Sequence, residues 1–270
     1  MAQLKGWALI LGASSGFGAA TARALAQAGM DICGVHLDRK QTMHLVQGVQ
    51  ADVEAAGRRC VLHNINASDA AKRAAALDDL QGLLEADGDP GGVKVLMHSL
   101  AFGSLLPFVA PKAAEDARCI TPRQMDMTAD VMAHSLVYWT QEAVARGMLG
   151  EGARIYAMTS SGGTRVMPSY GAVSAAKAAL ESHCRQLAFE LGPRRIAVNA
   201  LRAGVTDTPA LRKIPGSEML LQGAAGRNPG GRLTEPSDVA GTIVALSQPG
   251  AGWISGNVIG VDGAEDVVGF

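Results

Sequence analysis

The chain has 270 residues, 48% apolar and 18% charged, so it can bury a substantial core, and we expect one domain over residues 1–270. A net charge of −1, without a Lys/Arg cluster interleaved with aromatic residues, argues against a nucleic-acid partner. Since no window of the sequence resembles a signal peptide or a membrane span, we expect a cytoplasmic protein with no membrane contact.

Short apolar runs alternate with longer stretches of helical periodicity along the whole chain. The expected strands cover residues 8–11, 32–36, 60–65, 93–98, 154–159, 196–201 and 258–261. The expected helices cover residues 16–28, 43–56, 70–86, 129–148, 170–191 and 236–246. This alternation is typical of a parallel sheet with helices on both faces, and it predicts a doubly wound Rossmann fold of the α/β class.

Two stretches, 102–126 and 207–232, do not fit this alternation. Each contains three prolines, and each follows an expected strand. The carboxyl ends of parallel strands meet at one edge of a sheet, where open α/β folds bind their ligands. We therefore expect both stretches to form the substrate cleft, with the second acting as a lid.

The four cysteines and six histidines are scattered along the chain. They show neither a C-x-x-C pair nor the spacing of metal ligands. The sequence therefore predicts no metal site and four reduced thiols, those of Cys33, Cys60, Cys119 and Cys184.

A glycine-rich turn connects the first expected strand to the first expected helix. Gly12 permits a tight turn, Gly16 lets the backbone approach a pyrophosphate at the helix N-terminus, and Gly18 allows the helix to pack closely on the strand. A tight turn without a ligand would need similar glycines, but the position between strand and helix favours a dinucleotide-binding loop. Its expected cofactor-binding residues are Gly12, Ser14, Ser15, Gly16, Phe17 and Gly18.

The residues after the second expected strand are placed to select the cofactor. Asp38 would accept hydrogen bonds from the adenosine ribose and favour NAD, whereas Arg39 or Lys40 would bind a 2′-phosphate and favour NADP. A solvated charged turn would explain the same residues without any role in binding.

Tyr170 and Lys177 open the long helix expected over 170–191. Seven residues are nearly two helical turns, so the two side chains lie on one face, about 10 Å apart along the axis, and can converge on one ligand. Either residue alone is common on a helix, but downstream of a dinucleotide-binding loop the pair is the candidate reaction centre.

The spacing of the glycines, G-x-x-x-G-x-G, resembles that of the short-chain dehydrogenases/reductases. Most members have Tyr-x-x-x-Lys, but here the residue four before Lys177 is Val173, which cannot transfer a proton. The six residues between Tyr170 and Lys177 resemble instead the enoyl-acyl-carrier-protein reductases. The resemblance implies that Lys177 binds the nicotinamide ribose and lowers the pKa of Tyr170, which acts as an acid.

The longer spacing has a plausible chemical reason. A ketoreductase delivers hydride to the carbonyl whose oxygen the tyrosine protonates. An enoyl reductase delivers hydride to the β-carbon, while charge develops on a thioester oxygen two carbons away. The oxyanion donor must then stand farther from the nicotinamide, as a tyrosine one helical turn earlier does.

The resemblance covers nearly the whole chain. The segments that look like those of enoyl reductases are 97–102, 194–200 and 204–208, and those that look like the NADPH-using type III enzymes are 211–215 and 231–232. Within them, the backbone of Val205 would hold the carboxamide and the hydroxyl of Thr208 the phosphates. The remaining cofactor-binding residues are Asn66, Ala67, Ser99, Leu100 and Ala101.

Two positions depart from these families. Ser160 stands where some enoyl reductases carry a second tyrosine and where ketoreductases keep their catalytic serine. It either helps to bind the thioester oxygen or only satisfies backbone at the strand end. Met132 stands where many ketoreductases place the Asn of a proton relay, which argues against that relay.

Together these features predict NADPH-dependent reduction of a trans-2-enoyl thioester by Tyr170, Lys177 and Ser160. NADPH is favoured because Asp38 lies two residues beyond the usual NAD-selecting acid of the family, and NADH stays open. The alternatives are a ketone or alcohol oxidoreductase with re-spaced machinery and a non-catalytic dinucleotide-binding protein. The carrier of the acyl chain would be either acyl carrier protein or coenzyme A.

The resemblance also implies a homotetramer, because in this family the helix that carries the tyrosine and the lysine commonly forms subunit contacts. The helix over 170–191 has a face of small side chains that permits close approach of another helix, either in a second subunit or within the monomer. These side chains are Ala172, Ala175, Ala176 and Ala179.

Overall fold

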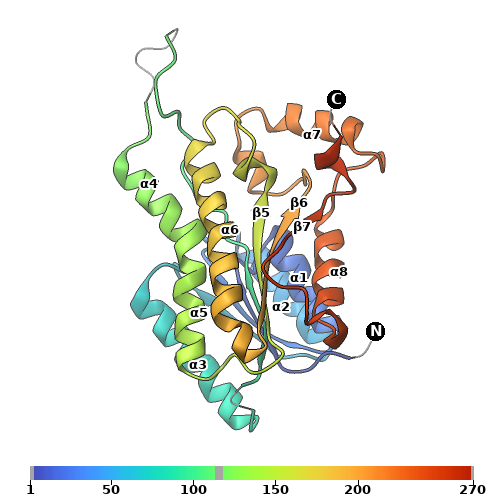
Figure 1. Ribbon diagram of the computed structural model, residues 1–270. Coiled ribbons are helices and arrows are strands. Elements are labelled where there is room, and N and C mark those ends of the chain that lie inside the picture. Colours follow the sequence, from blue (N-terminus) through green and yellow to red (C-terminus); the bar gives the residue numbers. More distant parts are fainter. Residues whose placement is uncertain (1–2, 90, 113–117, 269–270) are drawn as a thin grey trace.

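The computed structural model describes residues 3–89, 91–112 and 118–268 (Figure 1). These residues form a seven-stranded parallel sheet in the order β3-β2-β1-β4-β5-β6-β7. The strands are β1 (Trp7–Leu11), β2 (Asp31–His36), β3 (Cys60–Asn64), β4 (Val93–His98), β5 (Arg154–Ser160), β6 (Ala197–Ala203) and β7 (Val258–Val261). The helices are α1 (Gly16–Gln27), α2 (Met43–Ala55), α3 (Ala70–Ala86), α4 (Pro122–Ala129), α5 (Ser135–Ala145), α6 (Gly171–Leu191), α7 (Ser217–Arg227) and α8 (Pro236–Leu246). No helix in the described ranges is both long and apolar enough to span a bilayer.

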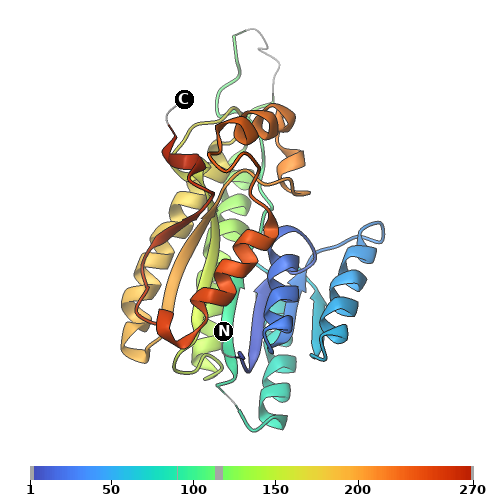
Figure 2. The same cartoon turned by 90° about the vertical axis from the view of Figure 1, so that its right-hand side faces the viewer.

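Helices cover both faces of the sheet (Figures 1 and 2). Successive side chains of a strand point to opposite faces. In β1, Leu9 and Leu11 face the core under α3, α5 and α6, whereas Ile10 faces the core under α1, α2 and α8. All of β1 is buried, as expected for a parallel strand covered on both sides. The predicted doubly wound α/β fold is confirmed.

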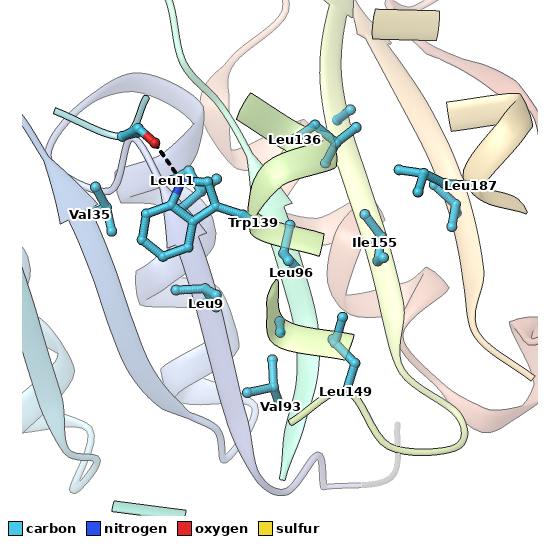
Figure 3. Close-up of a cluster of buried hydrophobic side chains, with 14 of the residues drawn as sticks. Leu9, Leu11, Val35, Val93, Leu96, Leu136, Trp139, Leu149, Ile155 and Leu187 are labelled. Atoms are coloured by element: carbon cyan, nitrogen blue, oxygen red, sulfur yellow. Dashed lines mark hydrogen bonds between the residues drawn. The ribbon is translucent and has the colours of Figure 1, made fainter. Parts of the chain in front are cut away.

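Trp139 of α5 is one of the largest side chains in the buried cluster, part of which is drawn in Figure 3. It packs beside Leu9, Leu11 and Leu96, and its indole N–H donates a hydrogen bond of 2.8 Å to the carbonyl oxygen of Ala67. This bond satisfies the buried indole and fixes the segment after β3 against α5.

The order of the strands reverses direction between β1 and β4. From β1 the chain moves outward to β2 and β3, then returns to place β4 on the other side of β1. Open α/β sheets bind ligands in the crevice at the carboxyl ends of such a pair of strands. The glycine-rich turn after β1 and the segment after β4 therefore flank the expected binding crevice.

The helix expected over 129–148 begins earlier, at Pro122, and its last α-helical residue is Ala145. Thr121 and Gln124 form a reciprocal capping box, and Pro122 occupies the first turn, where its missing N–H costs nothing. The sequence prediction took this proline as part of the loop 102–126. The end of that segment instead belongs to α4, which a π-helical turn (Asp130–His134) joins to α5. Residues 113–117 of the predicted loop lie outside the described residues.

The segment 207–232 contains a short 3-10 turn (Leu211–Lys213) and the helix α7, which was not predicted. Within α7 only Ala224 is buried. The described part of 102–121 and α7 both lie beyond the carboxyl ends of the strands (Figure 1). Both predicted loop segments are therefore placed at the edge expected for the substrate cleft.

Candidate active site

The glycine-rich turn between β1 and α1 depends on close packing that only glycine permits. Gly12 has a φ of +92°, and a Cβ there would overlap the carbonyl oxygen of Ser99. A Cβ at Gly18 would overlap the carbonyl oxygen of Gly12, so α1 packs directly on the turn. Gly12 and Gly18 therefore have the roles that the sequence predicts.

The N-terminus of α1 suits an anionic ligand. Ser15 precedes the helix without a side-chain capping bond, and the first turn carries no acidic residue. Gly16 has a φ of +52°, and the nearest neighbour of an added Cβ would be Thr208 Cγ2 at 3.5 Å. The Thr208 hydroxyl oxygen accepts from the Leu211 N–H at 3.1 Å, so its own hydrogen can be donated to an anion. Uncapped helix N–H groups attract phosphate, so this turn fits the pyrophosphate of a dinucleotide.

Asp38 lies just after β2, close to the glycine-rich turn. Its carboxylate is 3.1 Å from His36 Nδ1, and the hydroxyls of Ser14 and Thr42 also bond to it. Burial alone would raise the pKa of Asp38, but these hydrogen bonds and His36 lower it, so the carboxylate is charged at neutral pH. Arg39 next to it is exposed, as is Lys40. The structure thus places both candidate cofactor-selecting charges at one corner of the site.

Two further strands contribute to the same edge. The Ser99 N–H donates a hydrogen bond of 2.8 Å to the Leu11 carbonyl oxygen. A Cβ on Gly12 would lie 3.5 Å from Leu100 Cδ2, so the segment after β4 borders the glycine-rich turn. Ala101, the next residue of this segment, is exposed. Asn66 and Ala67 follow β3, at the carboxyl edge of the sheet. Most of the residues that are expected to contact the adenosine and the nicotinamide therefore lie along the carboxyl edge of the sheet.

His98 ends β4 but is not a proton donor at neutral pH. It is fully buried, and its Nε2 lies 2.9 Å from Ser135 Oγ. Burial, with the nearby charge of Lys177, lowers the pKa of His98 to about 3. The imidazole therefore stays neutral and acts in packing.

Tyr170 stands at the N-cap of α6, at the carboxyl end of β5. Ser169 before it has a φ of +59°, which turns the chain sharply into the helix. The Tyr170 ring packs on Gly162, where a Cβ would be 2.5 Å from Tyr170 Cε1. The hydroxyl lies 3.4 Å from Ser160 Oγ. The structure thus brings Tyr170 and Ser160 together, and Gly162 is a positioning residue that the sequence prediction missed.

Lys177 is buried on α6, nearly two helical turns after Tyr170. Its Nζ donates a hydrogen bond of 2.7 Å to the Met158 carbonyl oxygen. Met158 and Ser160 are two residues apart in β5, which corresponds to about 7 Å, so Lys177 and Tyr170 converge on the end of the same strand. Burial lowers the pKa of Lys177 to about 8, against the opposing charge of Glu181.

The expected effect of Lys177 on the pKa of Tyr170 stays a prediction, and in this structure other groups decide that pKa. Burial raises the pKa of Tyr170, and the influence that opposes burial is the hydrogen bond with Ser160. The reason is that the Lys177 ammonium is directed to the Met158 carbonyl, whereas the phenol is enclosed by apolar surroundings. Tyr170 is therefore a protonated phenol at neutral pH, the form that can donate a proton.

Val173 occupies the position four before Lys177 and is packed rather than open. An added Cβ on Gly103 would lie 2.8 Å from Val173 Cγ2 and 2.9 Å from Met132 Sδ. Phe108, half exposed, covers Gly171 so closely that a Cβ there would overlap its ring. The segment after β4 therefore gives the Tyr170 site an apolar wall.

The loop after β6 is held by a residue from the far end of the sequence. The Val205 N–H donates a hydrogen bond of 3.0 Å to the Glu265 carboxylate. Glu265 is buried in the short 3-10 turn Glu265–Val267 that follows β7. The expected bond from the Val205 backbone to a carboxamide stays a prediction, and in this structure its N–H already has a partner. Glu265 was missed because nothing local in the sequence pairs it with Val205.

Comparison with known proteins identifies the family. A family model described as enoyl-(acyl carrier protein) reductase matches residues 12–264. A 1-cyclohexenylcarbonyl-CoA reductase of Streptomyces collinus is 31% identical over 269 residues, covering 96% of this chain and 86% of that protein.

Solved structures agree on the fold. The enoyl-[acyl-carrier-protein] reductase (NADH) of Aquifex aeolicus has a TM-score of 0.81 at 24% identity, covering 98% of both chains. A short-chain dehydrogenase from Burkholderia cenocepacia in complex with NADP has a TM-score of 0.80 at 28% identity, covering 98% of this chain and 99% of that one. The chain therefore belongs to the short-chain dehydrogenase/reductase superfamily, in the enoyl-(acyl carrier protein) reductase family, and is an oxidoreductase of a family that uses nicotinamide cofactors.

Proposed function

We propose that this enzyme reduces the carbon–carbon double bond of a trans-2-enoyl thioester with NADPH. The observation that carries the proposal is the pair of positions on α6. Tyr170 presents its hydroxyl at the end of β5, beside Ser160, whereas Val173, four before Lys177, is buried in apolar packing. The family model and the S. collinus relative, a reductase of an enoyl coenzyme A thioester by name, point in the same direction.

The bound cofactor would supply a hydride to the β-carbon of the substrate. Tyr170, kept protonated by burial, donates a hydrogen bond and then a proton to the enolate that forms on the thioester. Ser160 orients the phenol from 3.4 Å away. Lys177 uses its ammonium to bind the ribose hydroxyls, and the wall that contains Phe108 excludes water from the enolate.

A comparison of two thioesters tests the proposal. We expect wild-type protein to oxidise NADPH much faster with a trans-2-enoyl coenzyme A than with the matching 3-keto coenzyme A. Tyr170→Phe should lose roughly 10²–10⁴-fold in kcat, with a smaller change in KM because the ring remains. The measurement is nicotinamide absorbance over a panel of acyl chain lengths.

Tyr138→Phe is the matched control. It removes the same hydroxyl group from α5, where the Tyr138 hydroxyl donates to Asp130 in the π-helical turn before that helix. It should keep the wild-type rate. Faster reduction of the keto thioester would sink the enoyl assignment, and full activity in Tyr170→Phe would move the chemistry to Ser160.

The proposed preference for NADPH is supported by the charged residues that follow β2. Asp38 is already engaged by His36, Ser14 and Thr42, whereas Arg39 is exposed and able to meet a 2′-phosphate. Arg39→Ala should lower kcat/KM for NADPH and leave that for NADH nearly unchanged. If the wild type uses NADH equally well, and Asp38→Asn impairs that use, Asp38 is the selecting residue instead.

We also propose that the enzyme is a homotetramer. Ala172 and Ala176 pack inside the monomer, but Ala175 on the same helix stays exposed. Large apolar side chains are exposed near the β7 edge of the sheet as well, which favours contact between copies of this chain.

A further inference from the structure

Glu265 joins two segments that are far apart in the sequence. Its Oε2 accepts from the Val205 N–H at 3.0 Å, and its Oε1 accepts from Arg227 Nη2 at 3.0 Å. Val205 belongs to the loop after β6, and Arg227 is the last residue of α7. Glu265 is only 5% exposed, so its carboxylate accepts both bonds in partly buried surroundings, where a charge-assisted bond is stronger than in water.

The C-terminal end of helix α7 is bonded to segments that are remote in the sequence. Its other residues are exposed or half exposed apart from Ala224. Asn228, directly after the helix, donates to the Asp262 carbonyl at 2.8 Å, beside the Arg227 bond. The opposite end of α7 starts at Gly216, with a φ of +76°. The C-terminal end is thus the anchored end of the predicted lid, next to the last described residues of the chain (Figure 1).

The neighbouring acid strengthens the same attachment. Asp266 pairs with Arg202 of β6 at 3.1 Å and with Arg165 of the β5–α6 connection at 2.9 Å. The 3-10 turn that carries Glu265 is therefore fixed to the sheet independently of α7. The sheet thus holds the backbone of the turn, and the Glu265 side chain is the link between Val205 and Arg227.

We propose that Glu265 is a positioning residue that couples the cofactor loop to the lid helix α7. Occupation of the loop after β6 by the cofactor fixes the Val205 amide, which fixes the Glu265 carboxylate and with it Arg227 and α7. This inference rests on the proposed cofactor site but not on the identity of the thioester. It explains why one buried carboxylate is shared between a main-chain amide and a helix end.

Three variants separate the two halves of the link. Glu265→Gln keeps an oxygen for the Val205 N–H but turns an amide NH₂ toward the Arg227 guanidinium, so it breaks only the lid half. Arg227→Gln breaks the same half from the other side, and Glu265→Ala breaks both. Arg195→Gln is the matched control, since Arg195 forms an exposed ion pair with Glu151.

The measurement is amide hydrogen exchange over 217–227, without cofactor and with NADPH or NADH, together with cofactor affinity by fluorescence titration. Without cofactor, Glu265→Gln and Arg227→Gln should each speed exchange by at least about fivefold. A double variant that carries both changes should exchange no faster than either single variant, because both changes break the same bond. In wild type the cofactor should slow this exchange. In the two Gln variants it should bind but no longer slow it, and in Glu265→Ala it should also bind more weakly.

Unchanged exchange over 217–227 in both single Gln variants would overturn the anchoring role. A wild type whose cofactor binds without slowing exchange there would overturn the coupling. Failure of wild type to bind either nicotinamide cofactor would overturn the proposed function and the coupling, while the cofactor-free arms would still decide the anchoring.

Discussion

Lys177 holds its ammonium inside the protein with the Met158 carbonyl as its hydrogen-bond partner. Burial disfavours the charged form and lowers the pKa to about 8, so a modest rise above neutral pH removes the proton. The neutral amine has fewer hydrogens to donate to a ribose. The two consequences, for affinity and for stability, have opposite signs.

We expect cofactor affinity to fall as pH rises through about 8, by up to roughly tenfold per pH unit above it. Lys177→Met should bind the cofactor weakly and without this pH dependence. Titrations of NADPH fluorescence from about pH 7 to about pH 9 provide the test. An affinity of wild type that is constant over this range would contradict a binding role for the ammonium.

The stability contributed by the same group should change the other way. Between about pH 8 and 10.5 the unfolded chain keeps a proton that the native protein has lost. The free energy of unfolding therefore gains from Lys177 as pH rises through this window. Urea unfolding should show a rising term in wild type that is missing in Lys177→Met.

At the scale of single residues, the sequence predicts what each side chain can do better than where it points. The pairing of Tyr170 with Lys177 follows from helical periodicity, and Ser160 follows from its distance along the chain. The pKa of Tyr170 does not, because it depends on burial by segments remote in sequence. The bond between Val205 and Glu265 links residues 60 apart and leaves no local pattern.

At the scale of elements, two glycines in the strand–turn–helix unit of β1 and α1 have different roles, one in packing and one in ligand binding. A Cβ at Gly18 would overlap the Gly12 carbonyl oxygen, whereas one at Gly16 would meet only Thr208 at 3.5 Å. The first change should damage the fold of the unit, and the second should affect its ligand.

Gly18→Ala should lower the free energy of unfolding by about 1–3 kcal/mol, because α1 must move away from the turn. Gly16→Val should weaken cofactor binding by at least about tenfold, and because Gly16 has a φ of +52°, the β-branched side chain should also lower the free energy of unfolding. Thermal unfolding and cofactor titration on both variants make the comparison. Equal cofactor affinity in Gly16→Val and wild type would remove the pyrophosphate from this turn.

Most elements are predictable because their signals are local. Buried parallel strands are continuous apolar runs, and the glycine-rich turn needs positive φ at fixed positions. The start of α4 is harder, since Pro122 can be read as a breaker or as the first residue of a helix, and only the capping box decides. Helix α7 is not predicted from the sequence because it buries a single residue, so its apolar positions show little helical periodicity.

At the scale of the whole molecule, an apolar surface remains at the β7 edge of the sheet. Trp253 is 98% exposed and Phe189 79%, and the turn at Gly256 packs on Ala188 of α6, so the segment after α8 lies along the end of that helix. Apolar side chains gathered in one exposed patch often mark a contact between subunits. A second copy of the chain would cover this surface in the proposed tetramer.

Trp253→Glu should therefore lower the mass of the assembly, because a charge would be buried in the contact. Val166→Glu is the control, since Val166 is 99% exposed and lies in the connection between β5 and α6. Native mass spectrometry of the two variants beside wild type gives the answer. A monomeric wild type, or an assembly that Trp253→Glu leaves intact, would contradict the proposed interface.

The shared carboxylate of Glu265 has a consequence for how the chain matures. Val205 and Arg227 leave the ribosome well before Glu265 does, so both wait for their buried acceptor while the rest of the sheet is already available to pair. A nascent chain that has not reached residue 265 therefore has a cofactor loop and a lid without their common support. Competence to bind the cofactor firmly is in this way deferred until residue 265 is available to accept both bonds.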